Sequence, residues 1–167
     1  MNLTPKERWA QAWIEHQLIS AHYGDGRAKR SGVRLMNHID EGLKILEKLG
    51  ASERAARAFC LHPLFQTDKD LLNTYGTDLS VYDPYVLTLV VEYRNTANAA
   101  LSVRDIIHPS EIELSPLEEV NDMLRADKLQ NYKDFLKYHS KTHPRAMALD
   151  IYFRCWIQRL GVVDVYV

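Results

Sequence analysis

The sequence has little of several residue types, and each scarcity excludes a class of protein. Only two cysteines occur among 167 residues, so the chain lacks the disulfide framework of a small secreted domain. Seven glycines and six prolines are typical of an ordinary globular chain and indicate no low-complexity tract. The formal charge of −1 gives the molecule no overall attraction to nucleic acid or to a membrane surface. Neither is therefore an expected partner, and any polyanion must be held by a local basic cluster.

Neither a signal peptide nor a membrane-spanning helix is expected from the sequence. No apolar run approaches the ~20 residues of a membrane-spanning helix. The first eight residues carry charges where a signal peptide would have its apolar segment. The two cysteines, Cys60 and Cys155, lie among apolar residues and are expected to be free thiols of the core, as in a reducing compartment. These features predict a cytoplasmic protein.

The remaining pattern is helical. Forty-six per cent of the residues are apolar, and the length of the chain suits one domain over residues 1–167. Helix-start signals occur at Thr4-Pro5, Ser52, Asp83-Pro84 and Ser115-Pro116, and Gly50 is placed to end a helix. Apolar residues recur at three- and four-residue steps after each start. The sequence therefore predicts an all-α fold, a single bundle of about seven helices.

The expected helices can be given approximate bounds. They run from residue 4 to about 22, from about 35 to 49, from 52 to 62, from 67 or 68 to 75, from 83 to about 101, from 115 to 136 and from 143 to 160. The spacing of Trp9, Trp13 and Trp156 predicts that they fill the bundle. The last helix is expected to bury four residues, Met147, Ile151, Cys155 and Leu160.

One histidine occupies an unusual place. His62 follows an apolar stretch and precedes Pro63, so it is expected at the buried end of the third helix, where a polar ring requires a partner. His38 falls in the middle of the preceding predicted helix, and a short turn at Gly50 makes the two helices antiparallel. The two rings could then face each other, with Asp127 of the long sixth helix completing a site for Zn, Mn or Fe. Alternatively, both are core histidines that bond to each other or to Asp127.

Several motifs occur in an order that resembles the HD domain of the RelA/SpoT family. They extend from about Ile19 to Val162 and include a basic-Ser-Gly loop, two histidines and an Ala-Asp-Lys-Leu-x-Asn segment. The motifs are Ala21-His22, Arg30-Ser31-Gly32, Asn37-His38, Leu61-His62, Ala126-Asp127-Lys128-Leu129-Gln130-Asn131 and Arg159-Leu160-Gly161.

The resemblance implies a function and a set of site residues. It implies that His38, His62 and Asp127 hold a divalent metal, which is Mn in that family. It also implies that Lys29, Arg30, Ser31 and Asn131 bind a guanine nucleotide, although a solvated charged loop is the other interpretation of residues 27–32. Family members of this type remove pyrophosphate from the 3′ position of guanosine tetra- or pentaphosphate.

The sequence departs from the family at three acidic positions. Pro63 replaces the aspartate of the His-Asp pair, and Gln66 and Thr67 replace the two acids that act on the attacking water. Glutamine is no general base near neutral pH, and threonine carries no charge to hold a cation. Gln66 and Thr67 thus occupy the family's catalytic positions but lack the carboxylates that act there. Asp68 or Asp70 could supply a displaced carboxylate.

Three functions are consistent with this sequence. The first is a metal-dependent phosphohydrolase that acts on a nucleotide polyphosphate through a three-ligand centre. The second is a degenerate site that binds or senses a guanine nucleotide without hydrolysing it and that holds no metal. The third is a helical domain that only supports structure or binds a partner. Metal content and nucleotide binding distinguish the three.

Overall fold

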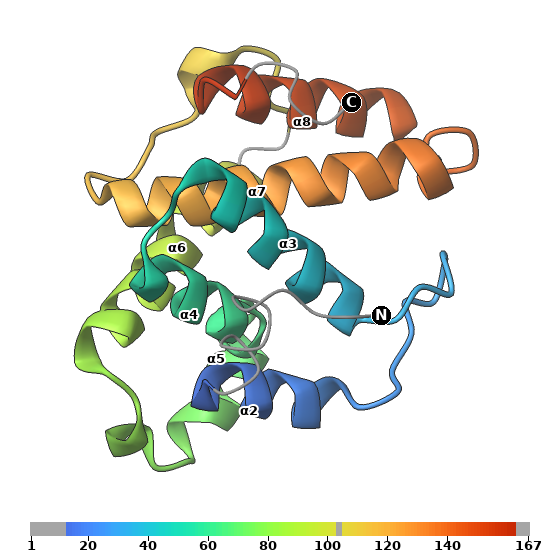
Figure 1. The fold of residues 1–167 in the computed structure, drawn as a ribbon. Helices are drawn as coiled ribbons and strands as arrows, with labels where there is room; N and C mark the ends of the chain where they lie inside the picture. Colours follow the sequence, from blue (N-terminus) through green and yellow to red (C-terminus); the bar gives the residue numbers. More distant parts are fainter. Residues whose placement is uncertain (1–12, 103–104, 163–167) are drawn as a thin grey trace.

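The computed structural model describes residues 13–102 and 105–162, and within these ranges the chain is an all-α domain without a strand (Figure 1). The predicted fold class is therefore confirmed. The α-helices are α2 (Ile14–Tyr23), α3 (Met36–Leu49), α4 (Glu53–Leu61), α5 (Asp68–Tyr75), α6 (Pro84–Ser102), α7 (Glu118–Asp134) and α8 (Ala146–Arg159). Single 3₁₀ turns cover His62–Leu64, Leu79–Val81 and Pro109–Glu111, and α7 continues into a π-helical turn, Phe135–His139.

Capping residues predicted from the sequence are present at the ends of several helices. The hydroxyl of Ser52 accepts a hydrogen bond from the Ala55 amide at 3.1 Å, and Gly50 ends α3 with a positive φ of 70°. Thr67 and Asp70 form a complete capping box at the start of α5. The cap predicted at Thr4-Pro5 and the core position predicted for Trp9 lie outside the described residues.

Helix α7 is the centre of the bundle. It contacts α3, α4, α6 and α8, and it lies between α8 on one side and the pair α3 and α4 on the other (Figure 1). The core around it contains fully buried large side chains, among them Phe59, Tyr93, Leu124 and Trp156. Both cysteines are buried free thiols, as predicted. None of the helices in the described ranges is long and apolar enough to cross a membrane.

Part of the prediction for α8 is wrong. Cys155 and Leu160 are buried as expected, but Met147 is 79% exposed and Ile151 is 37% exposed. Met147 and Cys155 are eight residues apart, or about 80° around the helix, so they belong to one broad apolar face, of which only the part near Cys155 is covered by the rest of the bundle. Only the second half of α8 therefore buries this stripe.

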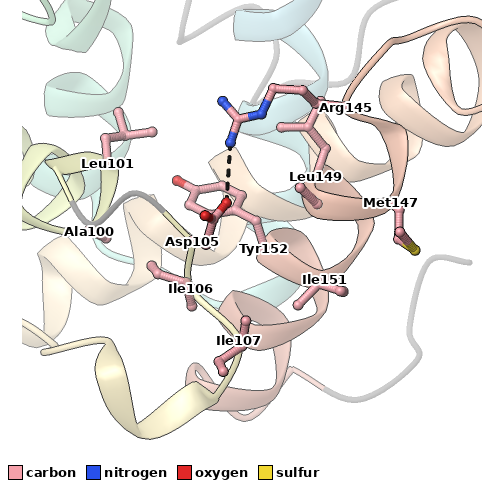
Figure 2. A pocket seen from close by; sticks show the side chains of 11 residues that line it. Ala100, Leu101, Asp105, Ile106, Ile107, Arg145, Met147, Leu149, Ile151 and Tyr152 are labelled. Atoms are coloured by element: carbon pink, nitrogen blue, oxygen red, sulfur yellow. Dashed lines mark ion pairs between the residues drawn. The ribbon is translucent and has the colours of Figure 1, made fainter.

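The exposed start of α8 forms one wall of a groove (Figure 2). The groove has a volume of about 300 Å³ and lies between α8, the end of α6 and the segment at residues 105–107. Leu101, Ile107 and Met147 give it apolar walls, and an ion pair between Arg145 and Asp105 crosses it with an N to O distance of 3.6 Å. Tyr152 is also part of its lining and connects it to the site described next.

Candidate metal centre

Three potential metal ligands from different helices meet in the core. His38 lies in the first turn of α3, not in the middle of the helix as predicted, His62 directly follows α4, and Asp127 lies within α7. The two Nε2 atoms are 3.2 Å apart, and Asp127 Oδ1 lies 3.4 Å from His38 Nε2 and 4.0 Å from His62 Nε2. Tetrahedral ligands at 2.0–2.1 Å from one zinc ion are separated by about 3.3 Å. The group could therefore hold a metal ion.

Pro63 helps to place the ring of His62. Proline has no amide hydrogen, so at this position it cannot bond to the carbonyl four residues earlier, which belongs to Phe59. That carbonyl oxygen lies 2.6 Å from His62 Nδ1 and accepts a hydrogen bond from it. The ring is also packed between the rings of Phe59 and Tyr93, at centroid distances of 4.7 and 5.0 Å. His62 therefore directs Nε2 toward His38 and Asp127.

Burial controls the protonation of His62. The side chain is 4% exposed, and this burial, assisted by the nearby His38, lowers its pKa from 6.5 to about 3, although Asp127 acts in the opposite direction. His62 is thus a neutral ring at physiological pH, which is the form that binds metal.

The low pKa of His62 predicts a pH-dependent stability for the metal-free protein. The unfolded chain takes up a proton near pH 6.5, whereas the folded chain does so only near pH 3. The contribution of His62 is therefore full above pH 6.5 and falls by up to about 1.4 kcal/mol per pH unit below it. Urea unfolding with a chelator, from about pH 7.5 to about pH 5.5, should show this loss in the wild type and not in His62→Gln. An equal slope in both proteins would contradict it.

Asp127 is held by a buried cation that the sequence analysis missed. Its Oδ2 accepts a hydrogen bond from Lys128 Nζ at 2.8 Å, and its Oδ1 accepts one from Asn131 Nδ2 at 2.8 Å. Lys128 is buried, with Nζ 5.1 Å from the ring centroid of Trp156 and 5.8 Å from that of Tyr152. Burial by itself would raise the pKa of Asp127, but Lys128 and then the two histidines hold it well below its usual value. Asp127 is therefore a carboxylate.

A buried tyrosine approaches the same carboxylate. Burial first, then the charge of Asp127 and a hydrogen bond to it, raise the pKa of Tyr93 well above 10. Tyr152 lies close enough to raise this pKa further. Tyr152 also lines the groove of Figure 2, and its ring centroid lies 5.8 Å from Lys128 Nζ, so the groove reaches the residues that surround the candidate metal centre.

The predicted nucleotide-binding residues fall into two places. Asn131 lies at the centre, in contact with Asp127. Lys29 and Arg30 are exposed in the loop before α3, which is closed by a bond from the Ala28 amide to the Val33 carbonyl at 2.9 Å. Ser31 Oγ accepts from the Val33 amide at 3.3 Å, so it supports this loop. The structure thus joins Asn131 to the ligands and places Lys29, Arg30 and Ser31 in a separate loop.

Arg30 faces a second basic segment. Partial burial, followed by the charges of Arg30, His139 and Arg145, lowers the pKa of His143. The loop before α3 and the turn after α7 therefore bring positive charge to the same side of the molecule, which Figure 1 shows at the right.

The predicted catalytic positions lie at the start of α5. The Gln66 carbonyl accepts from Asn98 Nδ2 at 3.2 Å, and the Thr67 side chain is used by the capping box. Asp70 is the other half of that box, and Asp68 pairs with Arg94. Neither aspartate belongs to the ligand group among the described residues. Gln66 and Thr67 remain predicted positions without a carboxylate of their own.

Tyr23, at the end of α2, connects this helix start to the metal ligands. Burial raises its pKa to about 12, and the charges of Asp70 and Asp127 contribute. The phenol therefore lies within electrostatic range of both carboxylates and is protonated at physiological pH. Sequence analysis gave no role to Tyr23, because nothing in its local sequence indicates the approach of α5 and α7.

The chain matches no model of a known protein family, no curated protein and no solved structure. Fold and site define an all-α protein with a candidate centre of two histidines and one aspartate. The resemblance to the HD domain remains a prediction.

Proposed function

We propose that the protein is a metal-dependent phosphohydrolase of the HD type that acts on a nucleotide polyphosphate, with guanosine polyphosphate as the expected substrate. His38, His62 and Asp127 would bind one divalent ion. Two imidazoles and a carboxylate suit Zn, Mn or Fe, and three protein ligands are the usual number at a catalytic zinc centre that keeps an open position. His38 is the most exposed of the three, so solvent and substrate would approach the centre from its side.

The observation that carries this proposal is the distribution of charge. Lys128 already neutralises the carboxylate of Asp127, and both histidines are neutral ligands when they bind metal. A divalent ion would therefore bring two uncompensated positive charges into a largely buried site, which favours an anion at the open position. Phosphate groups are suitable anions, and the metal would polarise a phosphoryl oxygen and lower the pKa of bound water.

The residues around the centre have separate roles in this proposal. Asn131 Nδ2 and Lys128 Nζ hold the two oxygens of Asp127, so Asp127 keeps a fixed orientation toward the ion. Tyr23 is protonated and can donate a hydrogen bond to a phosphate oxygen near the centre.

One observation favours binding without hydrolysis. Thr67 and Asp70 bond to each other in the capping box, and Gln66 cannot take up a proton near neutral pH. A protein with these side chains could bind the phosphates of a nucleotide, but it would leave the attacking water without a general base. Turnover distinguishes the two functions.

Metal analysis and nucleotide turnover test the proposal together. We expect the purified wild type to bind one equivalent of Zn or Mn and to release pyrophosphate from guanosine tetraphosphate in its presence. His38→Gln should lose both properties, whereas His108→Gln, which changes an exposed histidine, should keep them. Nucleotide binding without turnover would support the second function. A wild type that binds neither metal nor nucleotide would contradict both.

A further inference from the structure

We infer that Gln130 is a positioning residue that fixes the proton of His38 on Nδ1 and so prepares the centre for a cation. The inference rests on the metal-binding part of the proposed function. Gln130 lies on α7 and is 1% exposed. Its Oε1 is 2.6 Å from His38 Nδ1, a hydrogen bond between residues 92 positions apart.

Two carboxylates determine which way the Gln130 amide points. Its Nε2 lies 2.7 Å from Asp134 Oδ2 and 3.3 Å from Glu41 Oε2. Burial opposes ionisation of Glu41, but hydrogen bonds from Lys133 and Gln130 lower its pKa, so it is a carboxylate. Carboxylates only accept hydrogen bonds, and the amide must therefore direct its NH₂ group toward them. Oε1 then faces His38.

This orientation fixes the tautomer of His38. An amide oxygen cannot donate, so His38 Nδ1 must carry the hydrogen, and Nε2 presents a lone pair in the neutral ring. His62 has the same tautomer, because its Nδ1 donates to the Phe59 carbonyl. The two Nε2 atoms are 3.2 Å apart, and each directs a lone pair toward the other and toward Oδ1 of Asp127. Three acceptors converge without a shared hydrogen, and a metal cation satisfies all of them.

Removal of the Gln130 oxygen would relieve this arrangement. His38 could then carry its hydrogen on Nε2 and donate it to His62 Nε2, which is already within hydrogen-bond distance. That pair would be satisfied without metal and would compete with metal binding. Gln130 therefore acts through His38, in the manner of the outer hydrogen bonds that orient histidine ligands in metalloproteins.

Zinc titration against a competing chelator tests this inference. Gln130→Met keeps the length of the side chain and removes the acceptor, and we expect zinc affinity to fall about 10–100-fold. In the matched variant Gln130→Glu with Asp134→Asn and Glu41→Gln, the amide and both carboxylates exchange places. The introduced carboxylate can accept from His38 and from the two introduced amides, so affinity should return to within about threefold of the wild type. Wild-type affinity in a folded Gln130→Met protein would overturn the inference.

Nitrogen NMR of the metal-free protein reports which nitrogen of His38 carries the hydrogen. A Gln130 that only packed against the ring would not affect this tautomer. We expect His38 to carry its hydrogen on Nδ1 in the wild type and in the exchanged variant, and on Nε2 in Gln130→Met. A wild-type His38 protonated only on Nε2 would overturn the role of Gln130. If the wild type bound no zinc, the proposed function would fail, and the NMR result would still decide whether Gln130 fixes the ring.

Discussion

Asp127→Asn is expected to destabilise the fold by about 3–5 kcal/mol and to abolish metal binding. The large effect comes from the partner that remains. Lys128 Nζ is buried beside two aromatic rings and has Asp127 as its charged partner. Asparagine can accept its hydrogen bond but cannot balance its charge, so an uncompensated ammonium group stays in the core. Urea unfolding at neutral pH, in the presence of a chelator, measures the loss.

A double variant separates stability from metal binding. Asp127→Asn with Lys128→Met replaces the buried ion pair by groups without charge, and exchanges of this kind are often neutral for stability. We expect it to regain most of the lost stability and to bind no zinc. A single variant as stable as the wild type, or a double variant as unstable as the single one, would show that the Lys128 charge is not the cause.

Gly42→Ala is expected to lower stability by about 1–3 kcal/mol and to weaken metal binding at the same time. Gly42 lies where α3 crosses α4, and a Cβ added there would be 2.2 Å from Cε1 of Phe59. The Phe59 ring is fully buried and packs against the rings of both His38 and His62. It therefore cannot move aside without disturbing the ligands. Unfolding and zinc titration of the same preparation measure both effects.

The control for this variant is a smaller side chain at the position of the ring. Phe59→Leu removes Cε1 and Cζ, the two ring atoms nearest to an alanine Cβ at position 42, and it leaves the carbonyl that holds His62 in place. The two substitutions together should cost less stability than the sum of each alone, because they relieve one another. Additive losses of stability would mean that the alanine at position 42 does not act through the Phe59 ring.

Local signals account for what the sequence predicted well. Ser52, Gly50 and Thr67 act on the backbone within a few residues of themselves, so their roles can be inferred without knowledge of the fold. The pairing of His38 with His62 could also be inferred, because a short turn joins their helices. Asp127, on the long sixth helix, was named as a residue that could complete the group, and the structure brings it to the same point.

The parts that sequence did not reveal depend on long-range packing. Lys128 and Gln130 look like surface residues of a polar helix, but α7 is surrounded by other helices, so both are buried. Glu15 is likewise fully buried and pairs with Arg57 at 2.8 Å, a partner on another helix. Met147 was predicted to be buried and is exposed. Apolar spacing identifies the buried side of a helix but not how much of its length other elements cover.

The three ligands also have a consequence for how the protein opens. They belong to α3, to the end of α4 and to α7, so a bound ion would act as a removable cross-link between the early helices and the central one. Partial opening of α3 and α4 alone would require release of the ion first. Loading and removal of metal would thus set the rate at which this half of the protein becomes accessible to proteases and to hydrogen exchange, even where the fold itself is unchanged.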